Sequence, residues 1–355
     1  MAFERQVMFW VAAVVVLAAA LWLLAGILLP FVAGLALAFL LNPLTSRVER
    51  LGMNRTIAAL TIVAVVVLAF VLLVLLIVPI LFDQLASFID NIPGYIRRLQ
   101  LLLADPGRPW LRKILGNTFA GGDAAVGDFV SQGAGWLTSF LRSLWSGGSA
   151  LISVFSLVVV TPVVAFYLIC DWPRIVDKVD GWVPLPQRDT VRELGREIEA
   201  TISGFIRGQT LVCLILGTFY AIGLTLVGLN FGLLIGLLSG IVSFIPYVGS
   251  ITGLVLAIGV AVAQFWPEWT WIVAVLGIFL FGQFVEGNVL APKLVGMSVG
   301  LHPLWLMFAL FAFGYLFGFV GLLLAVPVAA AIGVLARFAL RKYLASPLYT
   351  GDGKA

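Results

Sequence analysis

The sequence predicts an all-α polytopic membrane protein with about eight transmembrane helices, some broken or re-entrant, and a helical extracytoplasmic insertion. Of its 355 residues, 62% are hydrophobic and 11% are charged, whereas about 25% of the residues in a soluble domain are charged. The mean hydropathy is +1.13. Residues 6–46, 208–267 and 294–336 contain no Asp, Glu, Lys or Arg, and each run exceeds the roughly 20 residues of one ordinary span.

The N-terminal uncharged run contains Pro30, which we interpret as the divide between a first span at 7–29 and a short return at 31–41. The apolar part is much longer than that of a cleaved signal peptide. The loop that follows contains three arginines (Arg47, Arg50, Arg55) and one acidic residue. The positive-inside rule therefore places this loop in the cytoplasm. Residues 1–82 then form an N-terminal set of transmembrane helices, the last of which runs outward.

The middle of the chain alternates between polar and apolar segments. Residues 83–147 are the longest polar insertion, and we expect short amphipathic helices there on the outer face. Residues 148–170 return to the cytoplasm through a span that Pro162 should kink, because proline lacks the backbone donor. Residues 171–206 are charged on one face and apolar on the other, which predicts an amphipathic helix on the inner membrane surface.

Residues 207–342 are expected to form a transmembrane core with broken helices. Glycines at 228, 232, 236 and 240 open one helix face to close packing, and Pro246 and Gly249 then interrupt the apolar run. A second interrupted segment, 303–336, contains Gly318, Gly321 and Pro327. Paired interrupted helices on either side of a polar loop, here 286–302, indicate a binding site in secondary transporters. The tail 343–355 is predicted to be cytoplasmic, like the N-terminus.

Polar residues near these breaks are the candidate pathway residues. Glu286 could carry a proton in a partly dry cavity, or it could be a helix-end carboxylate paired with Lys293. His302, the single histidine, could titrate near neutral pH or cap the next helix. The amide side chains could bind a ligand or a cation, or could join neighbouring helices; Arg207 could contact substrate or reach lipid phosphates. The complete candidate set is Glu286, Asn288, Gln283, Tyr247, Pro246, Gln264, Lys293, His302, Arg207 and Gln209, with hinge or packing roles for Gly228, Gly232, Gly236, Gly240, Gly249, Pro162, Gly321 and Pro327.

The chain offers little for catalysis, a metal or a cofactor. The two cysteines, Cys170 and Cys213, lie in apolar runs, and one histidine cannot build a multi-histidine metal centre. The sequence contains no GxxxxGK[ST] phosphate loop and no HExxH. The basic residues lie in loops rather than in a stripe for nucleic acid. We therefore predict a protein that is not an enzyme and that has no cofactor, no metal and no nucleic-acid partner.

Short motifs in a fixed order carry a family resemblance. They are Leu41-Asn42-Pro43-Leu44 with Leu51-Gly52, Pro162 with Phe166-Tyr167-Leu168 and Asp171, Ile206-Arg207-Gly208-Gln209, Ile245-Pro246-Tyr247-Val248-Gly249, Glu286-Gly287-Asn288-Val289-Leu290 with Pro292, Gly296, His302-Pro303-Leu304, Gly321 and Pro327. In these motifs the sequence resembles the autoinducer-2 exporter family, formerly an uncharacterised permease family. It departs from the family pattern at Cys170, where a basic residue is usual, and at Ser250, where proline is common.

The resemblance implies a multi-pass protein of a prokaryotic plasma membrane, with about eight helices and a homo-oligomeric, pentameric assembly. It implies export of a small polar solute of the quorum-signal type, or alternatively exchange of Na⁺ or Li⁺ for protons. A non-transporting oligomeric scaffold and a passive channel are further alternatives. The lipid bilayer, a small polar solute or a monovalent cation with a proton, and further copies of the chain are thus the expected partners.

Overall fold

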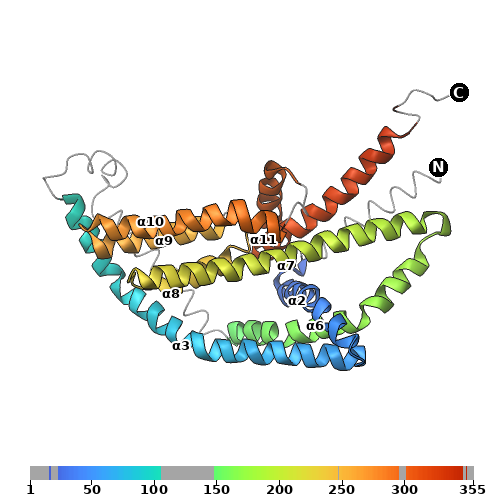
Figure 1. Cartoon of the computed structure of the whole chain (residues 1–355), viewed down its shortest axis with the longest axis horizontal. Coiled ribbons are helices and arrows are strands. Elements are labelled where there is room, and N and C mark those ends of the chain that lie inside the picture. Colours follow the sequence, from blue (N-terminus) through green and yellow to red (C-terminus); the bar gives the residue numbers. More distant parts are fainter. Residues whose placement is uncertain are drawn as a thin grey trace. The chain divides into compact units, whose positions relative to one another are not determined.

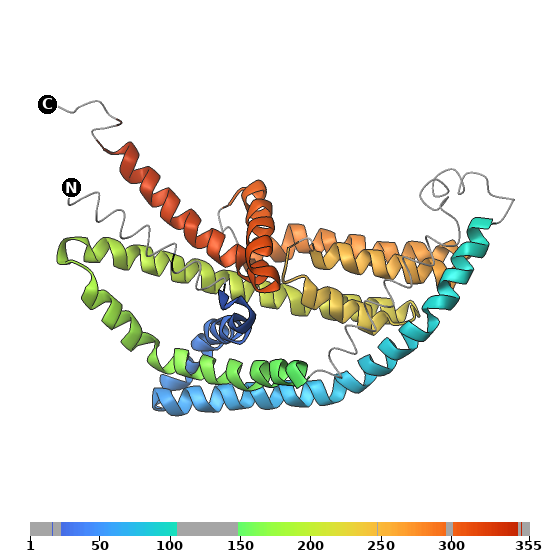
Figure 2. The ribbon, with the colours of Figure 1, turned by 180° about the vertical axis from the view of Figure 1, so that it is seen from behind.

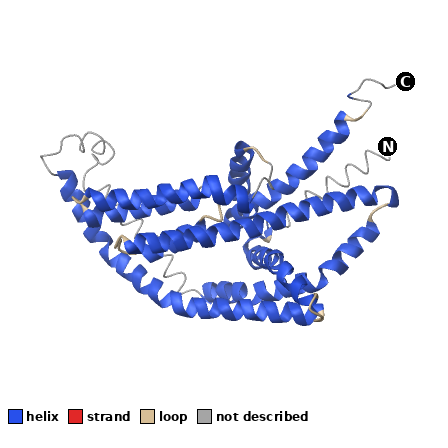
Figure 3. Ribbon diagram, in the orientation of Figure 1, coloured by secondary structure: helices blue, strands red, loops and turns tan. Residues whose placement is uncertain are grey.

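The computed structural model describes residues 16, 23–104, 148–246, 248–295, 301–346 and 349. Figure 3 shows helices joined by short loops, with no strand among these residues. Seven helices in the described part are long and apolar enough to cross a membrane, so the predicted all-α polytopic class is confirmed. In chain order the elements are α2 (Ala25–Glu49), α3 (Arg55–Ala104), α6 (Gly148–Trp182), the short 3₁₀ helix η1 (Leu185–Gln187), α7 (Arg188–Leu226), α8 (Gly232–Val242), α9 (Val248–Phe265), α10 (Trp269–Val285), the π-helix η2 (Glu286–Val295) and α11 (Pro303–Leu344).

The chain divides into two compact units, each made of separate stretches of sequence. Unit 1 comprises Met1–Leu68, Ser156–Leu211 and Leu290–Ala355, and unit 2 comprises Ala69–Phe155 and Val212–Val289. The long helices α3 and α7 therefore contribute residues to both units, and Figure 1 traces them by colour along the sequence.

Aliphatic side chains build the core of unit 1, where α2, α3 and α6 meet. Ala38 and Leu41 of α2, Ala59 and Val63 of α3, and Ala165 and Ile169 of α6 are all buried in one cluster. The three alanines are small enough to let the helix backbones approach closely, as is typical of helices that pack within a membrane. Gly34 of α2 extends this contact, because an added methyl group there would meet the side chain of Val164.

The predicted divide at Pro30 is wrong, because α2 continues through Pro30 and through Pro43. Pro30 lies near the start of α2, so its missing N–H removes one bond from the early turns and does not end the helix. Its ring is buried. The Pro30 carbonyl also accepts a hydrogen bond from Thr161 Oγ1 of α6, at 3.3 Å. The expected first span at 7–29 lies largely outside the described residues.

An arginine at the start of α3 donates the hydrogen bond that a proline removes from α6. Pro173 lies inside α6 and has no N–H to donate to the carbonyl of Ile169, four residues earlier. Arg55 Nε donates to that carbonyl at 3.0 Å, although 114 residues separate the two in sequence. The same guanidinium pairs with Glu49 at 3.2 Å and contacts Asn42 Oδ1 at 3.4 Å. One side chain thus joins α2, α3 and α6.

The predicted glycine face packs α8 against the end of α7 in unit 2. Methyl groups added at Gly232, Gly236 and Gly240 would meet the α7 backbone at Leu224, Ala221 and Gly217, respectively. Only glycine lets the two backbones approach so closely. Gly228, in the turn after α7, has φ of +75°, a conformation that costs glycine little.

The break predicted around Pro246 and Gly249 is present as a turn at 243–246 between α8 and α9. Gly249 is buried directly against the backbone of Ser243, which leaves no room for a larger residue. α8 spans 11 residues, and the backbone N–H of Leu234 in its first turn donates to Gln84 Oε1 of α3 at 3.1 Å. Figure 1 and Figure 2 both show α9 and α10 lying side by side in this unit.

The second interrupted segment folds as a helical hairpin within unit 1, and Gly318 is its hinge. Gly318 has φ 60° and ψ −138°, outside the helical region, and Figure 2 shows the sharp bend in α11. Gly321 then packs against the carbonyl of Phe313 across the bend. Pro327 was also expected to be a hinge, but it lies inside the second arm without ending it, as Pro162 does in α6.

Two predicted segment boundaries fall inside continuous helices. Residues 83–104 of the predicted insertion continue α3, and 105–147 lie outside the described residues. The charged segment 171–206 is not a separate helix, because α7 runs unbroken from Arg188 across position 206 to Leu226. The expected surface helix and the span that follows it are therefore parts of one continuous helix. Most of the tail 343–355 also lies outside the described residues.

We predict that Arg55→Ala lowers the free energy of unfolding in detergent by about 1.5–3 kcal/mol, because it removes a charged donor from a half-buried carbonyl. Thermal or denaturant unfolding of the purified protein measures this. Arg174→Ala is the matched control, since Arg174 pairs with Asp171 on the surface with 82% of its side chain exposed; its loss should cost under about 1 kcal/mol.

A double-mutant cycle tests the cause of that loss. Pro173→Ala restores a backbone donor to the Ile169 carbonyl, so Arg55→Ala should cost less in the Pro173→Ala background than in the natural chain. An equal cost in both backgrounds would contradict the assigned link between Arg55 and Pro173.

We also predict that Gly236→Ala destabilises unit 2 by about 1–3 kcal/mol, because its methyl group would collide with the α7 backbone. Gly259→Ala in α9 is the matched control, since an added methyl group there meets open space. That control should be neutral or stabilising by up to about 1 kcal/mol, the usual gain for alanine over glycine in a helix. Unfolding midpoints that fall equally for both variants would show that the close approach of α7 and α8 is unimportant.

Candidate functional site

The best-defined polar site lies where α10 ends and the π-helix begins. The expected irregular loop at 286–302 is instead helical over Glu286–Val295, and residues 296–300 lie outside the described part. A π-helix is rare, and short π segments inside helices are frequent at functional sites. Pro292 lies within η2 and supplies no backbone donor, so one backbone hydrogen bond is missing from this segment.

Glu286 and Gln283 form a direct pair at this junction. Gln283 Nε2 donates to Glu286 Oε2 at 2.8 Å across one helical turn, and the Glu286 side chain is half-buried. Asn288 turns back, because its Nδ2 donates to the carbonyl of Phe284 at 2.9 Å. Asn288 therefore closes the end of α10, while the carboxylate and amide of the pair form a polar surface.

A buried tyrosine on α7 completes the cluster. Tyr220 is 0% exposed, and its ring stacks on Phe279 of α10 with centroids 4.5 Å apart. Its ring and hydroxyl lie against Gly282, where any larger side chain would collide with them. Among the described residues the Tyr220 hydroxyl has no hydrogen-bond partner. We refer to Tyr220, Gln283 and Glu286 as the Glu286 cluster.

The Glu286 cluster belongs wholly to unit 2 and has further electrostatic neighbours. The carboxylate of Glu286 lies near Tyr220 and also near Cys213, two turns earlier on α7. Gln283 lies near the Tyr220 hydroxyl as well, but the two groups do not reach hydrogen-bond geometry. Sequence reasoning missed Tyr220, because one tyrosine in the apolar run of α7 has the same appearance as a core aromatic residue.

The other candidate residues do not join this cluster. Gln264 holds the turn between α7 and α8, because its Oε1 accepts from the backbone N–H of Asn230 and its Nε2 donates to the carbonyl of Gly228, both at 2.8 Å. It therefore bonds neighbouring helices, one of the two roles predicted. His302 caps α11, since its Nδ1 accepts from the N–H of Leu304 at 3.3 Å. The predicted capping role of His302 is confirmed.

Further candidates are spread over both units. Arg207 and Lys293 are exposed, while Gln209 is buried in α7. Pro246 is half-buried in the turn after α8, and Tyr247 lies outside the described residues. Gly208 packs against the backbone of Leu294, so α7 touches the end of η2 within unit 1.

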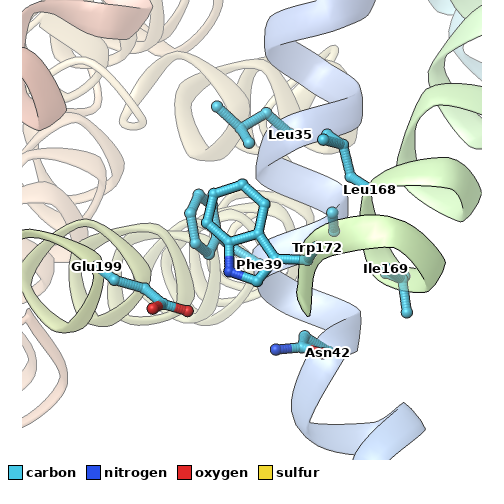
Figure 4. Close-up of a pocket in the computed structure, with 8 residues that line it drawn as sticks. Leu35, Phe39, Asn42, Leu168, Ile169, Trp172 and Glu199 are labelled. Atoms are coloured by element: carbon cyan, nitrogen blue, oxygen red, sulfur yellow. The ribbon is translucent and has the colours of Figure 1, made fainter. Parts of the chain in front are cut away.

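A second polar location is a small cavity in unit 1 between α2, α6 and α7. Figure 4 shows Phe39 and Trp172 together at its centre, with Asn42 on α2 and Glu199 approaching from α7. The two rings meet edge to face at 5.9 Å. The cavity has about 20 Å³ of space, room for about one water molecule. Its size suits a structural water better than a transported solute.

Metal chemistry has no evident site in the described part of the chain. There, no group of three or more His, Cys, Asp or Glu side chains is placed to hold a metal ion. Cys170 and Cys213 are both half-buried free thiols.

Comparison with known proteins agrees with a role in the membrane. A family described as AI-2E family transporter matches residues 11–341. The chain is 29% identical over 313 residues to “Putative transport protein YrrI” of Bacillus subtilis (strain 168), which covers 87% of this chain and 85% of that protein. It is 28% identical over 317 residues to “Putative permease PerM” of Escherichia coli (strain K12), covering 86% of each chain.

We predict that Gln264→Leu lowers the free energy of unfolding by about 1–3 kcal/mol, because two backbone groups at the α7–α8 turn lose their partner. The KM of transport should stay unchanged, since Gln264 lies outside the Glu286 cluster. Gln187→Leu, at an exposed position in η1, is the matched control and should affect neither quantity. A raised KM with unchanged stability would instead make Gln264 a ligand-binding residue.

Proposed function

Because the match over residues 11–341 shows that this chain belongs to the AI-2E transporter family, we propose that it is a secondary transporter in which the Glu286 cluster binds the transported species. The pair Gln283–Glu286 carries this proposal, since it places a half-buried carboxylate at the start of a π-helix. An ionisable group within a membrane-spanning segment marks a pathway for ions, protons or solute. The similarity to named transport proteins and permeases supports membrane transport in general.

The proposed cargo is a small polar solute of the autoinducer-2 type, moved out of the cell. Its export would be driven by a gradient, since the sequence contains no phosphate loop for ATP. In this mechanism Glu286 exchanges a proton as the solute binds and leaves. Gln283 holds the carboxylate through its amide, and the π-helix, with its non-standard bonding, provides the element that changes conformation.

We also propose the membrane topology predicted from the charges. The turn between α2 and α3, flanked by Arg47, Arg50 and Arg55, would face the cytoplasm, as would Arg341 and Lys342 in the last turn of α11. Both termini would then be cytoplasmic in a prokaryotic plasma membrane. The homo-oligomer implied by the family resemblance also remains a proposal.

Exchange of Na⁺ or Li⁺ for protons is the second candidate function. One observation favours it: Glu286 places the two oxygen atoms of a half-buried carboxylate at the start of η2. Oxygen atoms are the ligands that hard cations prefer. In that mechanism the cation and the proton would compete for the same carboxylate.

Flux in proteoliposomes that hold the purified full chain separates these functions. A pH-sensitive dye is enclosed, and Na⁺, Li⁺ or labelled autoinducer-2 is added in turn. We expect saturable movement of labelled autoinducer-2 that Glu286→Gln reduces to the level of protein-free vesicles, because the amide cannot release or accept the proton. A saturable proton signal with Na⁺ or Li⁺ that is lost in the same variant would assign the antiporter instead.

Glu268→Gln is the matched control for this experiment. Glu268 is exposed and precedes α10 at its opposite end, so its amide should leave flux unchanged. Full flux in the Glu286→Gln variant would contradict the proton role. Conductance without saturation would indicate a channel, and no movement of any probe would favour a scaffold.

A further inference from the structure

The Tyr220 hydroxyl has a feature that the proposed proton role of Glu286 does not explain. It is fully buried, and the described residues give it no hydrogen-bond partner. A buried polar group without a partner costs free energy, and native structures keep few of them. A partner that is absent from the resting chain but present during function would account for it.

The surroundings of Tyr220 show which kind of partner fits. The ring is fixed by stacking on Phe279 and by its contact with Gly282, where any side chain would collide with it. The hydroxyl can donate a hydrogen bond, whereas the nearby carboxylate of Glu286 can only accept when ionised. The site therefore presents one donor and one acceptor to an incoming molecule, at neighbouring positions of α7 and the end of α10.

Exposure falls stepwise through the Glu286 cluster. Gln283 is exposed, Glu286 is half-buried and Tyr220 is buried. The amide N–H of Gln283 donates a hydrogen bond to Glu286. The side chain of Gln283 also lies near the Tyr220 hydroxyl. A molecule that reaches Glu286 from the surface would therefore meet Tyr220 after Gln283 moves aside.

We propose that the Tyr220 hydroxyl is a solute-binding group of the transport site: it donates a hydrogen bond to an oxygen of a small uncharged molecule, whose own O–H group donates a hydrogen bond to Glu286. This inference rests on the proposed function. It assigns the solute a chemical class, an uncharged molecule that carries both an O–H donor and an oxygen acceptor. Gln283 then acts as the side chain that covers Tyr220 when no solute is bound.

Tyr220→Phe tests this directly, because it keeps the ring and its stacking and removes the hydroxyl alone. Proteoliposomes with the full chain and labelled autoinducer-2, a hydroxylated probe, give KM and kcat. We expect KM to rise about 3- to 10-fold, the effect of one neutral hydrogen bond. The melting temperature should stay the same or rise, since the variant no longer buries an unpaired hydroxyl.

Tyr315→Phe is the matched control, since Tyr315 on α11 is 91% exposed; neither KM nor melting temperature should change. An unchanged KM in Tyr220→Phe would overturn the inference. A lowered melting temperature, with or without a change in KM, would also overturn it, because the hydroxyl would then have a structural partner. If Glu286→Gln abolishes flux while Tyr220→Phe transports as the natural chain does, only this inference fails. Full flux in Glu286→Gln, or no saturable flux in the natural chain, removes the proposed function and with it this inference.

Discussion

Every backbone N–H and C=O group within a membrane must find a partner inside the protein, and this requirement governs the structure wherever a helix is interrupted. Side chains from distant parts of the sequence supply those partners. Arg55 serves the Ile169 carbonyl that Pro173 leaves unpaired, Gln264 serves both sides of the α7–α8 turn, and Gln84 serves the first turn of α8. Several polar side chains of this hydrophobic chain are thus committed to its own backbone.

Some polar groups near the π-helix also bond the backbone, but those of the Glu286 cluster do not. The Asn288 amide donates to the carbonyl of Phe284, and the His302 ring accepts from a backbone N–H at the start of α11. Glu286 and Gln283 pair with each other instead, and the Tyr220 hydroxyl has no partner in the described part of the chain. These three groups lie in one unit, next to the only π-helix among the described elements. Their position supports the proposal that the Glu286 cluster binds the transported solute and the proton.

The sequence predicted features that depend on local backbone chemistry. Glycines four residues apart indicated the packing of α8 on α7, and Pro246 with Gly249 indicated the turn that follows. The hinge of the last segment was predicted near Gly318, where the helix bends. A break was also predicted near Pro327, but the helix continues through it. A helix can continue through a proline when neighbouring groups compensate for the missing hydrogen bond. The divide predicted at Pro30 was wrong for the same reason, and Pro30 lies near the start of α2.

Features that depend on distant contacts could not be predicted from the sequence. Arg55 and Ile169 are 114 residues apart, so neither segment alone predicts the hydrogen bond between them. The π-helix at 286–295 has the polar, proline-containing composition of a loop. Glu286 and Gln283 were identified because carboxylate and amide groups are rare in apolar runs. Tyr220 was not, because an aromatic ring in such a run is common.

The most direct test of this account is the protonation state of Glu286 during transport. Infrared difference spectroscopy on the reconstituted protein, recorded before and after labelled autoinducer-2 is added, reports carboxylate and protonated carboxyl bands. The account predicts a change between these bands that is present in the natural chain and absent from Glu286→Gln. Solute movement without any such change would contradict the role of Glu286 as the proton-carrying group.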